Sequence, residues 1–334
     1  MGQWPCFIIV HKKEVIKPVP FPYIGGKEWD NMKCEEVFSI FPNILKEIVH
    51  EMDVNIEQMQ EMRVRADRPV LVSGGGREYR SRQTLTAAQV GEILAYISNY
   101  SLYAYEEEIR RGFLSLPGGH RVGLAGRTVL EQGRIKTLTE ISSLNIRFAH
   151  EIKGCADGLL PFLWKGEMLL HTLIVSAPGY GKTTLLRDCI RQISNGCGRH
   201  AGKTVGVVDE RSEIAGNFRG TPGNDLGLRT DVLDGCPKSE GIMMLIRSMA
   251  PEVVAVDEVG SREDIAALTS AMHCGCVLLA TIHGGAMEEL YQKPELEEMM
   301  EQRMFRRFVL LEQGRKPGKI GRILDEEGCE VHVI

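Results

Sequence analysis

Residues 171–184 read HTLIVSAPGYGKTT, and this stretch decides the fold. An apolar run leads into a turn that contains Gly179 and Gly181, and a helix is predicted from Thr183. A strand, a glycine-rich turn and a helix in this order are typical of a phosphate-binding loop. The glycines let the backbone curl so that its N–H groups point inward, and the start of the helix adds the positive end of its dipole.

The residues of this loop have separate predicted roles. Lys182 is expected to reach the β- and γ-phosphates of ATP, the Thr183 hydroxyl to bind Mg²⁺, and Thr184 to add a phosphate contact. Ser176 stands where the pattern G-x-x-x-x-G-K-[ST] begins with glycine, and because serine is small we expect the loop to form. The predicted nucleotide-binding residues are Ser176, Ala177, Pro178, Gly179, Tyr180, Gly181, Lys182, Thr183 and Thr184.

Apolar strands and helices alternate from about residue 151 onward. Further strands are predicted in TVGVVDE (204–210), EVVAVDE (252–258) and CVLLATIHG (276–284), with helices around 239–249 and 262–273. Continuous Val, Ile and Leu strands interleaved with helices predict an α/β domain, residues 151–334, with a mostly parallel sheet covered on both faces. Residues 303–322 hold seven basic residues and one acidic residue, which favours a solvated face or a docking patch for a partner or membrane surface.

Carboxylates follow two of these strands, and parallel strands end at the same edge of a sheet. Asp257 is expected to hold Mg²⁺ through water, and Glu258 to orient and deprotonate an attacking water. Glu210, in the second pair with Asp209, is assigned a supporting role in positioning the water or Mg²⁺, with a purely structural strand-tip acid as the alternative. His283 ends another strand, where its side chain is expected to hydrogen-bond the γ-phosphate and report its loss.

The first part of the chain has a different organisation. Residues 1–31 are rich in Pro and Gly without a period, which predicts a poorly ordered extension. Residues 32–150 predict a smaller α+β domain. It would contain a helical stretch from Met32, a hairpin turning at Gly74–Gly76, a helix capped by Thr86, a helix over 102–111 and strands between 118 and 148.

Composition narrows the functional classes. The chain has 45 acidic and 40 basic residues, a net charge of -5, and a protein that coats nucleic acid is usually basic. No apolar run approaches the roughly 20 residues of a membrane-spanning helix. If the protein works at a membrane, we expect only peripheral association.

The motifs between 176 and 285 together resemble the ATPases of type II and type IV secretion and pilus systems. The resemblance rests on a phosphate loop, an acidic box, a Walker B strand and a histidine box, here SAPGYGKTT, VVDERSE, LIRSMAPEVVAVDEVGSREDI and HCGCVLLATIHG in that order. With PGGHRVGLAGR and LNIRFAHEIKG, the chain over roughly 32–334 is similar to a branch of this family that acts in endospore formation. Residues 1–31 have no counterpart in it.

This resemblance implies a RecA-like P-loop ATPase domain and a ring of identical subunits, which in this family is a hexamer. It also implies a cytoplasmic motor on the mother-cell side of the forespore membrane, which works with membrane components of a secretion-like complex. In the family, arginines of the N-terminal domain close over the nucleotide. Arg121 and Arg127, six residues apart on a predicted strand, are expected on one face and are the candidates, followed by Arg147 and then Arg229 and Arg247.

Three other functions stay open at this point. RecA-like cores also drive nucleic-acid motors, but the negative charge and the 6% aromatic content disfavour a stacking channel. A small-molecule kinase does not generally need the water-activating Glu258. A nucleotide-dependent scaffold would bind ATP tightly and hydrolyse it slowly or not at all.

Overall fold

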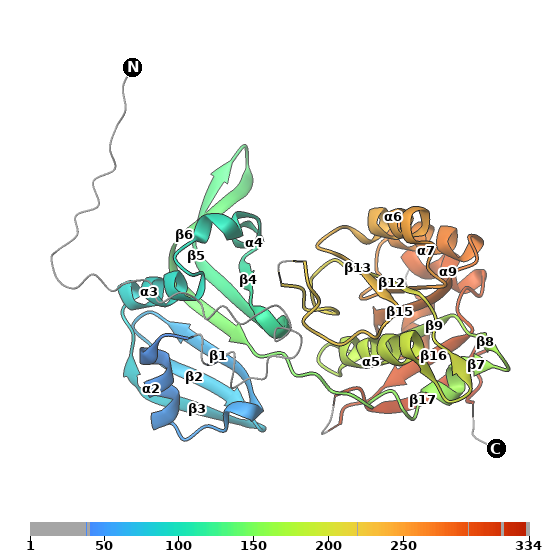
Figure 1. The fold of residues 1–334 in the computed structure, drawn as a ribbon, viewed down its shortest axis with the longest axis horizontal. Coiled ribbons are helices and arrows are strands. Elements are labelled where there is room, and N and C mark those ends of the chain that lie inside the picture. The colour runs from blue at the N-terminus through green and yellow to red at the C-terminus, as the bar shows by residue number, and fades with distance from the viewer. Residues whose placement is uncertain (1–37, 39–40, 219, 293, 315–316, 332–334) are drawn as a thin grey trace.

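The computed structural model describes residue 38 and residues 41–331, except 219, 293, 315 and 316. The extension predicted over residues 1–31 therefore lies outside the described residues. Two sheets with separate hydrophobic cores lie side by side, one in the N-terminal part and one in the C-terminal part (Figure 1). The mixed α/β architecture predicted from the sequence is confirmed.

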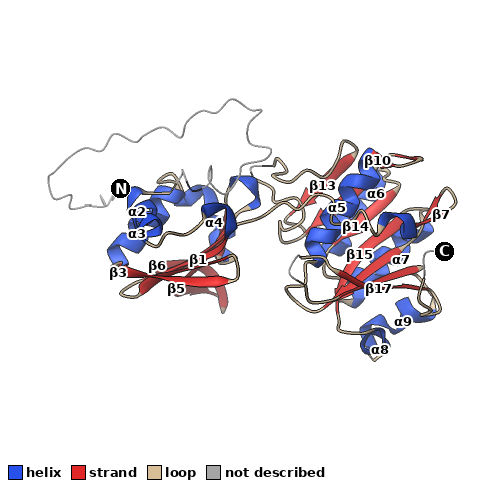
Figure 2. Cartoon of the chain, turned by 90° about the horizontal axis from the view of Figure 1, so that it is seen from below, coloured by secondary structure: helices blue, strands red, loops and turns tan. Residues whose placement is uncertain are grey.

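The N-terminal sheet has the strand order β3-β2-β1-β6-β5-β4. Figure 2 shows α2 and α3 on one face of this sheet, where their apolar side chains join the strands in one core. The Thr86 side chain caps α3 in a capping box with Gln89, as predicted. The elements are α2 (Asn43–Glu51), β1 (Met59–Arg65), β2 (Pro69–Gly74), β3 (Arg77–Thr84), α3 (Ala87–Ile97), α4 (Glu106–Arg110), β4 (Phe113–Ser115), β5 (Arg121–Glu131) and β6 (Arg134–Arg147).

The C-terminal sheet has the order β13-β12-β14-β15-β9-β16-β17, and its strands run parallel up to the antiparallel edge strand β17. Its strands are β9 (Thr172–Ser176), β12 (Val205–Asp209), β13 (Thr230–Asp234), β14 (Val253–Val256), β15 (Val277–His283), β16 (Arg307–Leu311) and β17 (Ile320–Asp325). The main helices are α5 (Lys182–Asn195), α6 (Lys238–Met249) and α7 (Arg262–His273). Smaller elements are β7 (Trp164–Lys165), β8 (Met168–Leu169), β10 (Gly196–Cys197), β11 (His200–Ala201), α8 (Met287–Tyr291) and α9 (Glu297–Glu301).

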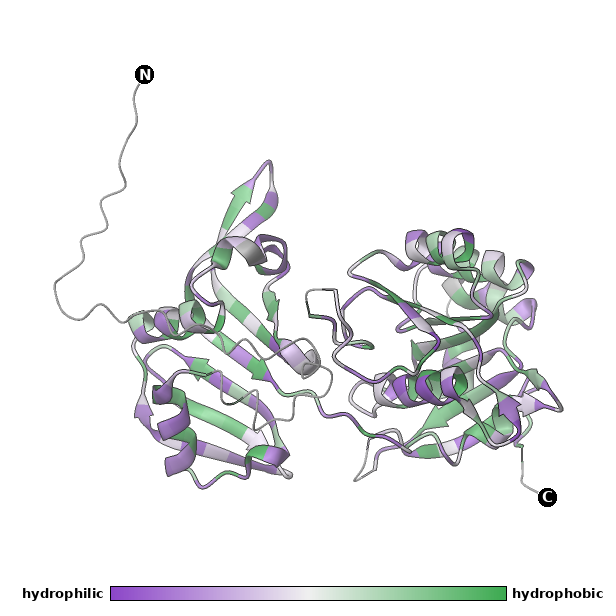
Figure 3. Cartoon of the chain, viewed as in Figure 1, coloured by the Kyte–Doolittle hydropathy of each residue, from purple (hydrophilic) through white to green (hydrophobic). Residues whose placement is uncertain are grey.

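Helices cover both faces of this sheet. The side chains of β14 alternate between the two faces. Val253 and Ala255 pack in the hydrophobic cluster that contains α5. Val254 and Val256 pack in the cluster that contains α6 and α7. A strand buried on both faces needs apolar residues at every position, which explains its continuous apolar sequence. Figure 3 shows hydrophobic residues concentrated on these central strands.

The basic segment 303–322 is only in part the solvated face that we expected. Arg303, Arg306, Lys319 and Arg322 are exposed, but a strand lies between them. Its residues Arg307–Leu311 form β16, a largely buried strand that pairs in parallel with β9. The basic residues flank this short apolar stretch, and Arg307 reaches back to donate to the Phe162 carbonyl at 2.8 Å. Net charge over a window therefore concealed a strand of only five residues.

Within the described residues, no helix combines the length and the apolar character needed to cross a membrane.

Candidate functional site

The turn between β9 and α5 has the backbone of a phosphate-binding loop. Gly179 and Gly181 have φ of +81° and +92°, which side-chain-bearing residues rarely adopt. A Cβ on Gly181 would lie 2.4 Å from the backbone nitrogen of Gly318, in the β16–β17 loop. That loop closes over the turn, because the Gly318 N–H donates to the Tyr180 carbonyl at 2.7 Å. Ser176 is buried, and its hydroxyl donates to the Ala177 carbonyl at 3.0 Å, so the departure from glycine is accommodated.

Lys182 and Thr183 open α5 and point to the acidic edge of the sheet. The Lys182 side chain is only 5% exposed, and burial lowers the pKa of its ammonium, against the opposing pull of Asp257 and Glu258. The Thr183 hydroxyl donates to Asp257 Oδ2 at 2.5 Å. A buried cation, a hydroxyl and a carboxylate thus converge where the loop meets β14.

Glu258 is held in a fixed position at the end of β14. Its φ is +53°, and its N–H donates to the Thr281 hydroxyl at 2.9 Å. One carboxylate oxygen lies 2.7 Å from His283 Nε2, and the other accepts from Arg211 Nη1 at 2.6 Å. Such left-handed backbone in a non-glycine residue is sparsely populated and is often found at functional sites.

His283 links Glu258 to the phosphate-loop lysine. Its Nδ1 lies 2.9 Å from Lys182 Nζ. The lysine ammonium can only donate, so Nδ1 accepts and Nε2 carries the proton that it donates to Glu258. The histidine therefore connects the group that would bind phosphate with the group that would bind water.

The second acidic pair divides between two tasks. Asp209 is buried, and its carboxylate accepts N–H groups from Glu213, Ile214 and Ala215, at 2.8–2.9 Å. Burial raises the Asp209 pKa to about 6, against these hydrogen bonds. Glu210 lines the same small hollow as Asp257 and Glu258, but its carboxylate is paired with the ammonium of Lys238.

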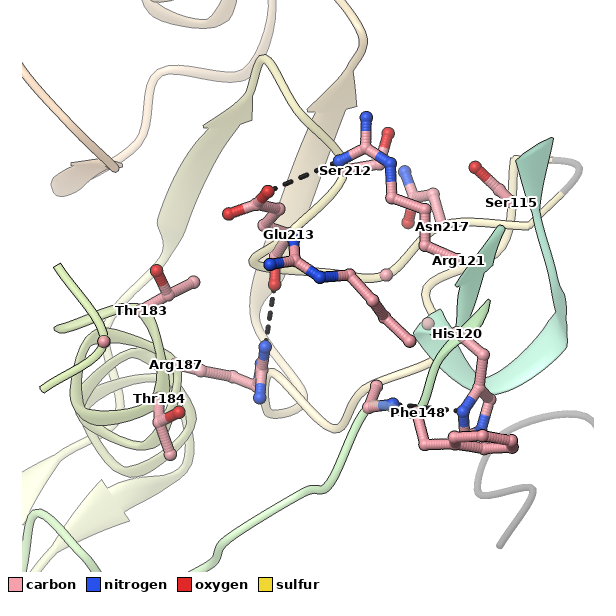
Figure 4. A pocket seen from close by; sticks show the side chains of 15 residues that line it. Ser115, His120, Arg121, Phe148, Thr183, Thr184, Arg187, Ser212, Glu213 and Asn217 are labelled. Atoms are coloured by element: carbon pink, nitrogen blue, oxygen red, sulfur yellow. Dashed lines mark hydrogen bonds and ion pairs between the residues drawn. The ribbon is translucent and has the colours of Figure 1, made fainter. Parts of the chain in front are cut away.

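A cavity of about 470 Å³ separates the phosphate loop from the N-terminal domain, and Figure 4 shows its lining side chains. Arg121 and Arg147, paired across β5 and β6, lie on one wall, and Gly179 and Thr183 on the other. Arg121 donates to Glu213 Oε1 at 3.3 Å, and burial lowers the pKa of its guanidinium. This arginine belongs to the N-terminal domain but faces the C-terminal one.

Arg127 is not brought to this cavity. Its side chain is 72% exposed and pairs with Glu140 at 3.3 Å. β1 pairs only with residues 143–147 of β6, and the β5–β6 register shifts between Ala125 and Arg127. Beyond that shift, the two strands form a ribbon that projects from the sheet (Figure 1). Of the further arginine candidates, Arg229 donates to the Ser194 carbonyl at 3.0 Å, and the structure places Arg247 on the exposed side of α6.

The structure adds Arg187 to the residues found from the sequence. Its guanidinium lines the cavity and donates to the carbonyls of Glu213 and Ile214, at 2.7 Å each. Arg187 follows Thr183 by four residues, so both side chains lie on one face of α5. This spacing is the signal by which the sequence could have indicated Arg187 as a site residue. Asn217 also lines the cavity. Its Oδ1 is buried without a hydrogen-bond partner among the described residues.

Comparisons with known sequences identify the family to which the chain is similar. The family model described as "Sporulation stage III, protein AA" matches residues 31–331. Stage III sporulation protein AA of Bacillus subtilis (strain 168) is 42% identical over 294 residues, which cover 88% of this chain and 95% of that protein. An uncharacterized protein ycf45 of Porphyra purpurea is 23% identical, over 80% of this chain and 43% of its own length.

Solved structures show the same fold. The ATPase DotB of Legionella pneumophila superimposes with a TM-score of 0.57 at 14% identity, covering 86% of this chain and 81% of that one. The pilus retraction motor PilT with bound ADP gives 0.53 at 13% identity, covering 84% and 80%. These likenesses confirm the RecA-like fold with a smaller N-terminal domain.

Proposed function

Because this chain belongs to the family of stage III sporulation protein AA, we propose that it hydrolyses ATP to ADP and phosphate to drive a secretion-like complex during endospore formation. The fold shared with the ATPase DotB and the motor PilT supports an ATPase-like machine. The chemistry of the residues around Lys182 and Glu258 supports hydrolysis in particular.

The residues present fit a magnesium-bound triphosphate. Lys182 is a buried cation on a glycine turn whose left-handed backbone suits inward-facing N–H groups. Thr183 and Asp257 supply the hydroxyl and carboxylate oxygens that Mg²⁺ prefers. When bound there, Mg²⁺ would neutralise charge on the phosphates. In this proposal Ser176, Ala177, Pro178, Tyr180 and Thr184 complete the wall of the loop.

The observation that carries the proposal is the chain of contacts Lys182–His283–Glu258. Glu258 accepts the proton from the attacking water, and His283 holds the carboxylate in place by donating from Nε2. Because Nδ1 of the same ring accepts from Lys182, a phosphate that draws the lysine away releases one side of the histidine. The water-activating group thereby responds to occupancy of the phosphate loop.

Arg121 supplies the remaining positive charge in this proposal. It approaches the cavity from the N-terminal domain, and an arginine that meets the transferred phosphoryl group can speed hydrolysis by about 10³–10⁵-fold. Glu210 has a supporting role through its pair with Lys238.

We further propose that the chain works as a homo-oligomeric ring, a hexamer. In the cell it would act in the cytoplasm, peripherally on the mother-cell side of the forespore membrane, with membrane components of the secretion-like complex as its partners. The resemblance to secretion ATPases supports these assignments. We expect size-exclusion chromatography with light scattering to give a ring mass in the presence of Mg²⁺ and ATP, and a monomer under all conditions would contradict it.

The test of the activity is phosphate release from ATP by the purified chain, with and without Mg²⁺ and with and without single-stranded DNA. We expect hydrolysis that needs Mg²⁺ and does not respond to DNA. Tight ATP binding without hydrolysis would refute the enzyme and favour a scaffold, and stimulation by DNA would favour a nucleic-acid motor.

A further inference from the structure

Two loops from different domains touch through glycines beside the cavity. One loop, with Pro117–Gly119 at its centre, leads into β5 of the N-terminal domain. The other follows β12 in the C-terminal domain and contains Gly216 and Gly223. We call the meeting of Gly119 with Gly216 and Gly223 the glycine contact.

The backbones approach too closely for a side chain at Gly216 or Gly223. A Cβ on Gly216 would lie 2.6 Å from the Cα of Gly119, and a Cβ on Gly223 would lie 3.0 Å from the Gly119 nitrogen. Gly216 and Gly223 are buried. Gly119 and Gly216 also have positive φ, whereas Gly223 does not, so close approach alone requires glycine at 223.

Each loop is anchored within its own domain. On the N-terminal side, His120 is buried, accepts the Ala149 N–H at its Nδ1 at 3.0 Å and meets the ring of Phe148 edge-on. On the C-terminal side, the Asp209 carboxylate binds the start of the loop, and Gly223 donates to the Ala215 carbonyl at 2.9 Å. The glycine contact therefore joins two well-held backbones.

The C-terminal loop is also tied to the helix that starts at the phosphate loop. Arg187 of α5 donates to the carbonyls of Glu213 and Ile214. Glu213 in turn accepts from Arg121, which follows Gly119 by two residues in β5. Gly119 and Gly216 line the cavity together with Arg121 and Glu213, and Figure 4 shows the ion pair between these two side chains.

We propose that the glycine contact is a positioning device that sets how far Arg121 stands from the phosphate loop. Because the three glycines have no side chains, the two backbones can come into direct contact. This contact sets the smallest distance between the two domains at this point. Gly119, Gly216 and Gly223 act through Arg121 and touch no substrate. This role rests on the proposed ATP hydrolysis and adds to it the means by which the N-terminal domain is held in register with the site.

The test is Gly223→Ala in the full chain, with Gly220→Ala as the matched control. Gly220 lies in the same loop, is exposed, and has nothing within 4 Å of a Cβ placed on it, although its φ is +83°. In Gly223→Ala the new Cβ would lie 2.8 Å from the Gly216 carbonyl oxygen and 3.0 Å from the Gly119 nitrogen, so both loops must give by a few tenths of an ångström. Because a misplacement of about 1 Å at a reacting group costs on the order of 100-fold in rate, this smaller shift should cost about 10-fold. We expect kcat to fall by about that factor with ATP affinity unchanged, and Gly220→Ala to match the wild type.

A double variant separates positioning from general damage. If the contact acts through Arg121, Gly223→Ala should cost little more once Arg121→Ala is present, because the two changes remove one function. Additive losses, or an unchanged kcat in Gly223→Ala, would overturn the positioning role while wild-type hydrolysis still supports the proposed function. Failure of the wild type to hydrolyse ATP would instead overturn the proposed function, and with it this role.

A melting curve for each variant guards against a trivial loss of fold. If Gly223→Ala unfolds, Gly119→Ala replaces it, since its Cβ would approach no atom closer than 3.3 Å. Its φ of +77° is close to that of Gly220, so the same control applies. We expect the loss of kcat in Gly119→Ala again to vanish in the Arg121→Ala background, and an additive loss would overturn the proposal.

Discussion

Replacing Glu258 by glutamine tests the assignment of the water-activating group. Glutamine keeps the shape of the side chain and can still accept from His283 Nε2, but it cannot take a proton. General-base catalysis by a positioned carboxylate contributes about 10²–10⁴-fold, so hydrolysis should fall by that factor. Stability should change by no more than about 1 kcal/mol, because the Arg211 partner is 62% exposed and a solvent-exposed ion pair contributes little.

The assay compares nucleotide affinity with turnover in the same preparation. ATP affinity from a fluorescent-nucleotide titration should be retained, since Lys182, Thr183 and Asp257 are unchanged, while phosphate release falls. Glu210→Gln is the comparison variant, because this carboxylate also lies at the strand edge but pairs with Lys238; its supporting role predicts a smaller loss of turnover than in Glu258→Gln. Turnover lost in Glu210→Gln and kept in Glu258→Gln would refute the assignment and exchange the roles of the two acids.

Further variants test the cation, the arginine and the buried acid. Lys182→Ala removes a charge-assisted contact of about 1.5–3 kcal/mol, so ATP affinity should fall about tenfold or more, and an unchanged titration would contradict the phosphate loop. Arg121→Ala should slow phosphate release far more than it weakens ATP binding. Arg127→Ala should match the wild type, because Arg127 pairs with Glu140 on the exposed ribbon. Equal losses of phosphate release in both variants would refute this distinction. Asp209 has a folded-state pKa of about 6 against 3.8 ordinarily, so its contribution to stability is full below pH 4 and is lost as pH rises through 6, by about 3 kcal/mol. Urea unfolding of the wild type and Asp209→Asn should therefore show a stability difference that shifts against the wild type between pH 4 and pH 7, and a constant difference would contradict the raised pKa.

The parts of the site that could be predicted from the sequence are those set by short, local patterns. The loop around Lys182 follows from one strand, one turn and one helix, which lie together within residues 172–195. The acids at 257 and 258 follow because strands with apolar residues at every position are buried and end at a common edge.

What could not be predicted depends on register and on long-range packing. The even spacing of six residues predicted Arg121 and Arg127 on one face of a strand. The register shift between Ala125 and Arg127 instead separates the ribbon that carries Arg127 from the sheet. The partner of Glu210 is Lys238, which lies 28 residues further along the chain at the start of α6 and has no signal in the local sequence. The burial of β16 was hidden because its short apolar run is flanked by basic residues.

The position of β16 has a consequence for how the chain acquires its fold during synthesis. β9 lies between β15 and β16, so the strand that carries the phosphate loop is flanked by a strand that leaves the ribosome after every other strand of this sheet except β17. Until residues 307–318 have emerged, β9 has an open edge and the loop lacks its cover over Gly181. An exposed apolar edge invites pairing with other chains, so a stalled nascent chain would be prone to aggregate. The turn around Gly181 is thus completed late in translation, after the strands that end in Asp209 and lead into Asp257 have emerged.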